Sequence, residues 1–113
     1  MKMHTVAMKA RTVFEHKSVN KKILQTLYEK YTTVPDCKQF IERASDLFPK
    51  LNCGLASVYL QYLLKKGRII QGKYGENNHT FLLVKNTIID ITADQYGGPK
   101  IYIGPLQVPW SLK

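Results

Sequence analysis

The chain has 113 residues, 44% of them hydrophobic and 22% charged, a composition that excludes a disordered chain and fits a single domain with its own core. No stretch approaches the roughly 20 apolar residues of a membrane helix, and residues 1–17 lack the apolar segment of a secretory signal, so we expect a cytoplasmic protein with no membrane partner. The net charge of +9 is spread along the chain, which favours a solvated surface and predicts that any nucleic-acid binding is non-specific.

The first half of the chain has the apolar spacing of helices. Residues 5–14 show no clear period, and a strand and a flexible basic arm both stay open for them. Ser18 is the expected N-cap of a helix after that segment. One face of this helix carries apolar residues at three- and four-residue spacing, namely Leu24, Leu27, Tyr28 and Tyr31.

A second helix is expected between two prolines. Pro35 suits its first turn, and Pro49 ends it. Its predicted inner face consists of Phe40, Ile41, Ala44, Leu47 and Phe48.

A third helix is predicted from Cys53 to about Lys66, with Asn52 as its N-cap and Gly67 as its left-handed stop. It carries the strongest apolar stripe in the chain, formed by Leu55, Val58, Tyr59, Tyr62 and Leu63. Such a stripe is typical of a helix buried against a sheet.

Beyond residue 67 the pattern indicates short strands. They are expected at residues 68–74, 79–84, 87–92 and 101–103, arranged as an antiparallel meander. The sequence therefore predicts an α+β domain in which N-terminal helices precede a helix packed on a small antiparallel sheet. Within one domain, 1–113, we distinguish a helical part (1–50), a core (51–104) and a C-terminal tail (105–113), where Trp110 is expected to fill the core.

Cys53 is the first candidate functional residue. Without an export signal a disulfide is not expected, and Cys53 begins a helix whose unpaired N–H groups stabilise a thiolate. Cys37 also lies in a first helical turn, but its neighbour Asp36 would raise the pKa of the thiol. We therefore interpret Cys37 as a structural thiol.

His79 and Asp90 are expected to lie on the same face of the sheet. If Lys85 and Asn86 form a two-residue hairpin loop, the alternation of side chains along the two strands makes His79 and Asp90 diagonal neighbours. A carboxylate there would orient the imidazole, whose other nitrogen would face the thiol of Cys53. A structural histidine and an inert cysteine remain the alternative interpretation.

These segments resemble a known enzyme family. A cysteine that opens a helix (residues 52–57), a histidine that opens a strand (79–82) and an aspartate on the partner strand are similar to the transglutaminase-like branch of the papain-like cysteine hydrolases. The segment Ile89-Asp90-Ile91-Thr92-Ala93-Asp94-Gln95-Tyr96 resembles an Ile-Asp-Leu-Thr-x-x-Gln-Phe signature of small bacterial and phage proteins of that branch. The resemblance covers about residues 50–104.

The resemblance implies Cys53 as nucleophile, His79 as general base and then acid, and Asp90 as the orienting residue. It also implies Asn52 or Gln95 beside the oxyanion. The expected function is a cysteine hydrolase or acyltransferase that acts on an amide of a protein or peptide substrate through a Cys53 thioester. The alternative is a catalytically silent effector or inhibitor of the same fold that binds protein or nucleic acid. No cofactor and no metal are expected, since the sequence has no CxxC or HExxH motif.

Overall fold

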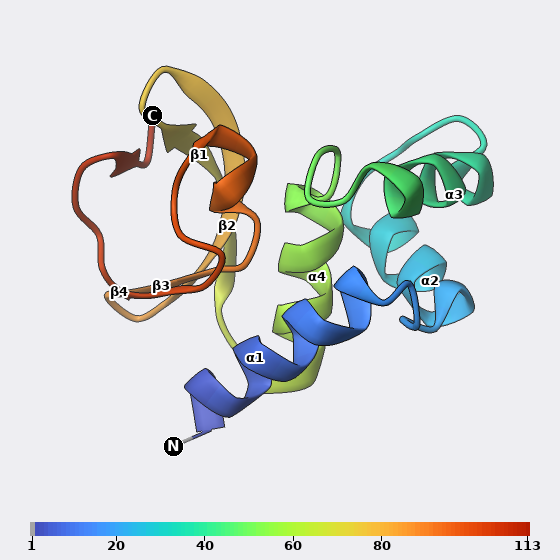
Figure 1. Ribbon diagram of the computed structural model, residues 1–113, viewed down its shortest axis with the longest axis horizontal. Helices are drawn as coiled ribbons and strands as arrows, with labels where there is room; N and C mark the ends of the chain where they lie inside the picture. The colour runs from blue at the N-terminus through green and yellow to red at the C-terminus, as the bar shows by residue number, and fades with distance from the viewer. Residues whose placement is uncertain (1) are drawn as a thin grey trace.

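Four α-helices precede an antiparallel sheet of five strands in the computed structural model, which describes residues 2–113 (Figure 1). The α+β prediction, with helices first and the sheet after them, is confirmed. The helices are α1 (Lys2–Glu15), α2 (Lys21–Tyr31), α3 (Cys37–Leu47) and α4 (Cys53–Leu64). The strands are β1 (Arg68–Tyr74), β2 (Asn77–Val84), β3 (Thr87–Asp90), β4 (Tyr102–Pro105) and β5 (Trp110–Ser111), and a 3₁₀ helix, η1 (Ala93–Tyr96), follows β3.

Residues 5–14, which the sequence left open between a strand and an arm, belong to helix α1. This helix buries residues at three- and four-residue spacing, Ala7, Ala10, Arg11 and Phe14. It packs against α4 and touches β3. Small alanines on the buried face allow close contact with α4, and they carry little hydrophobic signal in the sequence.

Several helix ends differ from their predicted positions. The N-cap of α2 is Asn20, whose side chain accepts a hydrogen bond from Ile23 N–H, and not Ser18. Asn52 makes no side-chain cap at α4. This helix ends at Leu64, and its C-cap Lys65 adopts the left-handed conformation that was predicted for Gly67. On α3 the predicted core residue Leu47 is 45% exposed, because it lies in the last turn, beyond the buried Ala44.

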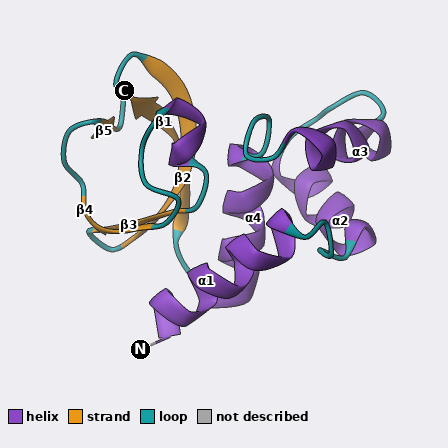
Figure 2. Ribbon diagram, in the orientation of Figure 1, coloured by secondary structure: helices purple, strands orange, loops and turns teal. Residues whose placement is uncertain are grey.

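Helix α4 lies between the sheet on one side and α2 and α3 on the other (Figure 2). Its buried side chains join the larger apolar cluster, which includes Leu82, Val84 and Ile89 of the sheet and Ile91, which directly follows β3. The curled sheet encloses a second, smaller cluster on its other face, formed by Phe81, Leu83, Ile88, Ala93 and Trp110. The predicted burial of Trp110 is confirmed.

The sheet order is β4-β3-β2-β1-β5. The predicted hairpin at Lys85 and Asn86 is confirmed, since Val84 pairs with Thr87 and Leu83 with Ile88. The last strand, β5, crosses to the far edge and pairs with Lys73 and Tyr74 of β1. In residues 2–113 no helix has the length and apolarity needed to cross a bilayer.

Candidate active site

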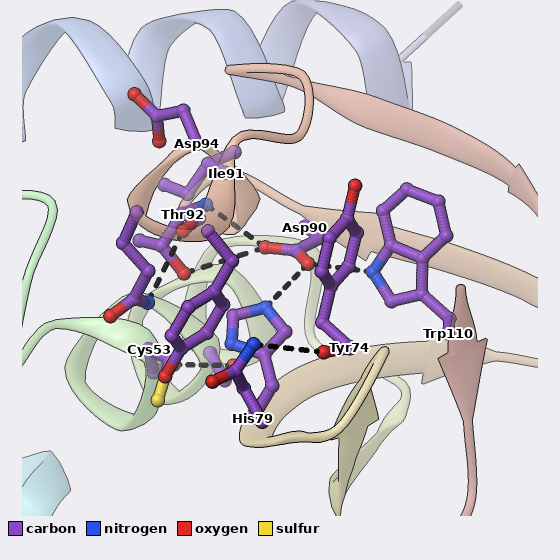
Figure 3. A network of polar contacts seen from close by, with 12 residues as sticks. Cys53, Tyr74, His79, Asp90, Ile91, Thr92, Asp94 and Trp110 are labelled. Atoms are coloured by element: carbon purple, nitrogen blue, oxygen red, sulfur yellow. Dashed lines mark hydrogen bonds and ion pairs between the residues drawn. The ribbon is translucent and has the colours of Figure 1, made fainter. Parts of the chain in front are cut away.

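His79 and Asp90 form the shortest polar pair of the site. His79 Nε2 lies 2.6 Å from Asp90 Oδ2, and each residue is 2% exposed (Figure 3). The β2–β3 register places both on the inner face of the curl, together with Phe81. The spatial relationship expected from strand alternation is therefore present.

The Asp90 carboxylate has donors on both oxygens. Oδ2 accepts a second hydrogen bond from Trp110 Nε1 at 2.8 Å, and Oδ1 accepts one from the backbone N–H of Thr92 at 2.9 Å. The Thr92 hydroxyl lies 3.4 Å from Oδ1. A buried carboxylate that accepts this many hydrogen bonds is held in one orientation.

Cys53 occupies the first position of α4 and is partly exposed. Burial raises the pKa of its thiol, but the neighbouring His79 ring and the backbone and hydroxyl of Thr80 favour the thiolate, so that the pKa lies below its ordinary value. The Asn52 side chain makes no capping hydrogen bond, so it leaves the first N–H groups of α4 unoccupied. These N–H groups add positive potential at the sulfur.

The His79 ring is biased toward its protonated form. Burial alone would lower its pKa, but the hydrogen bond to Asp90 and the nearby Cys53 thiol raise it to about 9. The second ring nitrogen, Nδ1, is buried, and no group within residues 2–113 makes a hydrogen bond of good geometry with it. Cys53 is close enough to His79 for hydrogen bonding and charge to raise the pKa of the ring.

Cys53 and His79 open onto one depression of about 410 Å³. The other residues that line it are Gln71, Gly72, Asn78 and Thr80. A molecule in this depression can reach the partly exposed Cys53, whereas the His79 side chain lies buried beneath the surface.

Aromatic rings surround the imidazole and the sulfur. Tyr96 presents its ring edge-on to His79 at 5.5 Å between centroids, and its hydroxyl donates to the Asn78 carbonyl oxygen at 3.1 Å. Burial, and then the charge of Cys53, raise the pKa of Tyr96, while burial, Tyr31 and Cys53 do so for Tyr28. Both tyrosines therefore lie within range of the charge of Cys53.

The two residues considered as oxyanion donors are differently placed. Both amide hydrogens of Asn52 are used, because Nδ2 donates to the carbonyl oxygens of Ala44 at 2.8 Å and Lys50 at 2.7 Å. Asn52 therefore fixes the loop before α4 and has no hydrogen left for an oxyanion, contrary to the expectation. Gln95 uses one amide hydrogen, donating to Thr92 O at 3.2 Å, and is half-buried.

Arg11 of α1 supports the segment that follows Asp90. Its guanidinium forms two 2.8 Å hydrogen bonds to the Asp94 carboxylate and one of 2.8 Å to the Ile91 carbonyl oxygen. Thr92, whose N–H binds Asp90, lies between these two residues. Sequence reasoning missed both Arg11 and Trp110 as partners of the site, although a buried carboxylate and a buried indole N–H each require partners.

Cys37 also begins a helix, but its burial and its charged neighbours differ from those of Cys53. It is 4% exposed, and burial, then Glu29 and Asp36, raise the pKa of its thiol. The interpretation of Cys37 as a structural thiol agrees with this environment. Among residues 2–113 no three His, Cys, Asp or Glu side chains lie close enough together to hold a metal ion.

Comparison of the chain with protein-family models, with curated proteins and with solved structures finds no match.

Proposed function

We propose that the protein is a cysteine hydrolase or acyltransferase that acts on an amide bond, with Cys53 as nucleophile, His79 as acid and base, and Asp90 as the residue that orients His79. The observation that carries the proposal is the 2.6 Å contact of His79 with a fully hydrogen-bonded Asp90, on a ring whose other nitrogen is left for the thiol of Cys53. The resemblance of residues 50–104 to the transglutaminase-like hydrolases supports the same roles.

The ground state favours nucleophilic attack. With the pKa of His79 raised to about 9 and that of Cys53 lowered, a proton shared by the two groups is drawn toward the ring and leaves a thiolate. The negative charge of Asp90 stabilises the imidazolium that results.

The reaction then has two steps. Cys53 Sγ attacks the carbonyl carbon of the amide, a C–S bond forms, and His79 gives its proton to the leaving nitrogen as the C–N bond breaks. In the second step His79 takes a proton from water or from an amine, which attacks the thioester. The C–S bond breaks, the acyl group is released, and the Cys53 thiolate and the protonated His79 are restored. We assign stabilisation of the oxyanion to the backbone N–H groups at the start of α4.

The test is alkylation of the two cysteines of one molecule by iodoacetamide. We expect Cys53 to react at least about tenfold faster than Cys37 at pH 7, because the alkylation rate follows the thiolate fraction and the access to the sulfur. Mass spectrometry of the peptides separates the two sites, and Cys37 serves as the internal control. Equally slow labelling would contradict the proposal and favour the alternative of a catalytically silent binding module.

Amide chemistry is tested separately, by hydroxylamine capture of the acyl group. A peptide substrate that yields a hydroxamate with the wild type, and none with Cys53→Ala or His79→Gln, supports the thioester route. A hydroxamate that forms equally with Cys53→Ala would show that the sulfur is not the nucleophile.

A further inference from the structure

The outer edge of strand β1 is only partly covered. Strand β5 pairs with β1 at Lys73 and Tyr74, while residues 68–71 have no strand partner on that side among residues 2–113. We call residues 68–71 the open edge. Unpaired backbone groups on an edge strand are a template for the backbone of another chain.

A second depression lies beside the open edge. It has a volume of about 410 Å³ and is formed between α2, α4 and β1. We call it the α2 groove, and its lining residues are Leu27, Lys30, Tyr31, Val58, Gln61, Tyr62 and Ile69. Its walls are mainly aliphatic and aromatic.

The α2 groove adjoins the depression that holds Cys53. Gln71, which lines the site, donates through Nε2 to the hydroxyl of Tyr31, which lines the groove, at 2.7 Å. Ile69 and Gln71 are two residues apart on β1 and therefore lie on the same face of the strand. The two depressions thus follow one another along the open edge.

The side chains that carry a fixed charge on this surface are basic. Neither depression is lined by an Asp or Glu. Lys30 is exposed at the α2 groove, and Arg68 is exposed on the open edge. Such a surface attracts an anionic chain and repels a cationic one.

We propose that the open edge and the α2 groove bind an extended, acidic polypeptide segment of the substrate protein. Its backbone adds to β1 as a further strand, and an apolar side chain enters the groove between α2 and α4. Delivery of its amide to Cys53 rests on the proposed function, whereas binding does not. Since an extended residue spans about 3.3 Å, the distance along β1 from Ile69 to Gly72 places the apolar side chain about three residues from the reacting amide.

The binding test uses the Cys53→Ala protein, which cannot turn over a substrate. The probe is a fluorescent ten-residue peptide with one leucine flanked by aspartates. Two control peptides are used: in one the aspartates are replaced by lysines, and in the other the leucine is replaced by glycine. We expect the acidic leucine peptide to bind best and to shift the backbone NMR signals of residues 68–71. Equal binding of all three peptides, or shifts confined to other segments, would overturn the proposal.

Two groove variants sharpen the test. Lys30→Glu and Tyr62→Ala should each weaken binding of the acidic leucine peptide by about fivefold. This is the effect expected from the loss of one exposed charge interaction or one partly buried apolar contact. Lys9→Glu is the matched control, because Lys9 is exposed on α1 and lines neither depression. If Lys9→Glu weakened binding as much as Lys30→Glu, the net charge of the protein alone would explain the binding, and the groove proposal would be refuted.

Failure of this proposal and failure of the proposed function give different results. A reactive Cys53 in a protein that binds none of the peptides contradicts the groove alone. Selective peptide binding by a protein whose Cys53 alkylates as slowly as Cys37 supports the groove and contradicts the chemistry.

Discussion

Trp110 donates its indole N–H to the same oxygen of Asp90 that binds His79, at 2.8 Å and 2.6 Å respectively. The ring of Trp110 is stacked on Tyr102 at 3.8 Å between centroids and meets Tyr74 edge-on. The C-terminal strand thus helps to hold the carboxylate that orients the imidazole.

Trp110→Phe should destabilise the protein by about 1–3 kcal/mol. Phenylalanine preserves much of the ring packing, but one oxygen of a buried carboxylate loses a donor. Urea unfolding followed by circular dichroism measures the free energy of unfolding.

The control for this change is Tyr102→Phe. It removes a hydroxyl that donates to the Pro105 carbonyl oxygen at 2.7 Å in an exposed setting, and leaves the stacked ring in place. Its cost should stay below about 1 kcal/mol. A larger cost for Tyr102→Phe than for Trp110→Phe would show that the Trp110–Asp90 bond does not matter for stability.

Asp90→Asn should raise the pKa of the Cys53 thiol. Without the negative charge beside it, His79 loses the main influence that raises its pKa and holds its proton less firmly, so the thiolate loses its partner. The alkylation rate of Cys53, measured against pH, should then move to higher pH. Asp46→Asn, which changes an exposed carboxylate on α3, should leave the profile in place; an equal shift in both variants would contradict a specific role for Asp90.

The raised pKa of His79 predicts that stability falls as the solution becomes alkaline. The folded protein holds the His79 proton more tightly than the unfolded chain, so its contribution is complete below pH 6.5 and is lost as the pH rises to about 9. The lowered pKa of Cys53 has the opposite sign and offsets part of this loss. Between pH 6.5 and 9 the wild type should lose about 1–3 kcal/mol more than His79→Gln; parallel curves for the two proteins would mean that His79 is not charged in the fold.

The two strands that carry His79 and Asp90 could be predicted because their information is local. The two-residue loop at Lys85 and Asn86 sets the register, and alternation along each strand then assigns every side chain to a face. Cys53 was identifiable for the same reason, since the start of its helix is marked within a few residues.

The parts that were missed depend on contacts between distant segments. Arg11 meets Asp94 across 83 residues, and Trp110 meets Asp90 across 20, through a strand of only two residues. No periodicity encodes such contacts. Helix α1 was missed because its buried positions include two alanines and a charged residue, which do not form an apolar stripe.

Arg11→Met tests whether α1 belongs to the site. Arg11 is 6% exposed, and methionine would fill part of its volume while leaving Asp94 and the Ile91 carbonyl oxygen without their donor. Breaking a largely buried ion pair from one side should cost about 2–4 kcal/mol in the free energy of unfolding. Because these two groups flank Thr92, whose N–H binds Asp90, the alkylation rate of Cys53 at pH 7 should fall as well.

The control for this change is Lys17→Met, which removes the exposed 3.3 Å pair with Asp46. It should change the free energy of unfolding by less than about 1 kcal/mol and leave the alkylation rate unchanged. If Arg11→Met lowers stability but leaves the reactivity of Cys53 intact, Arg11 supports the fold alone and the chain of contacts from α1 to Asp90 does not position the imidazole.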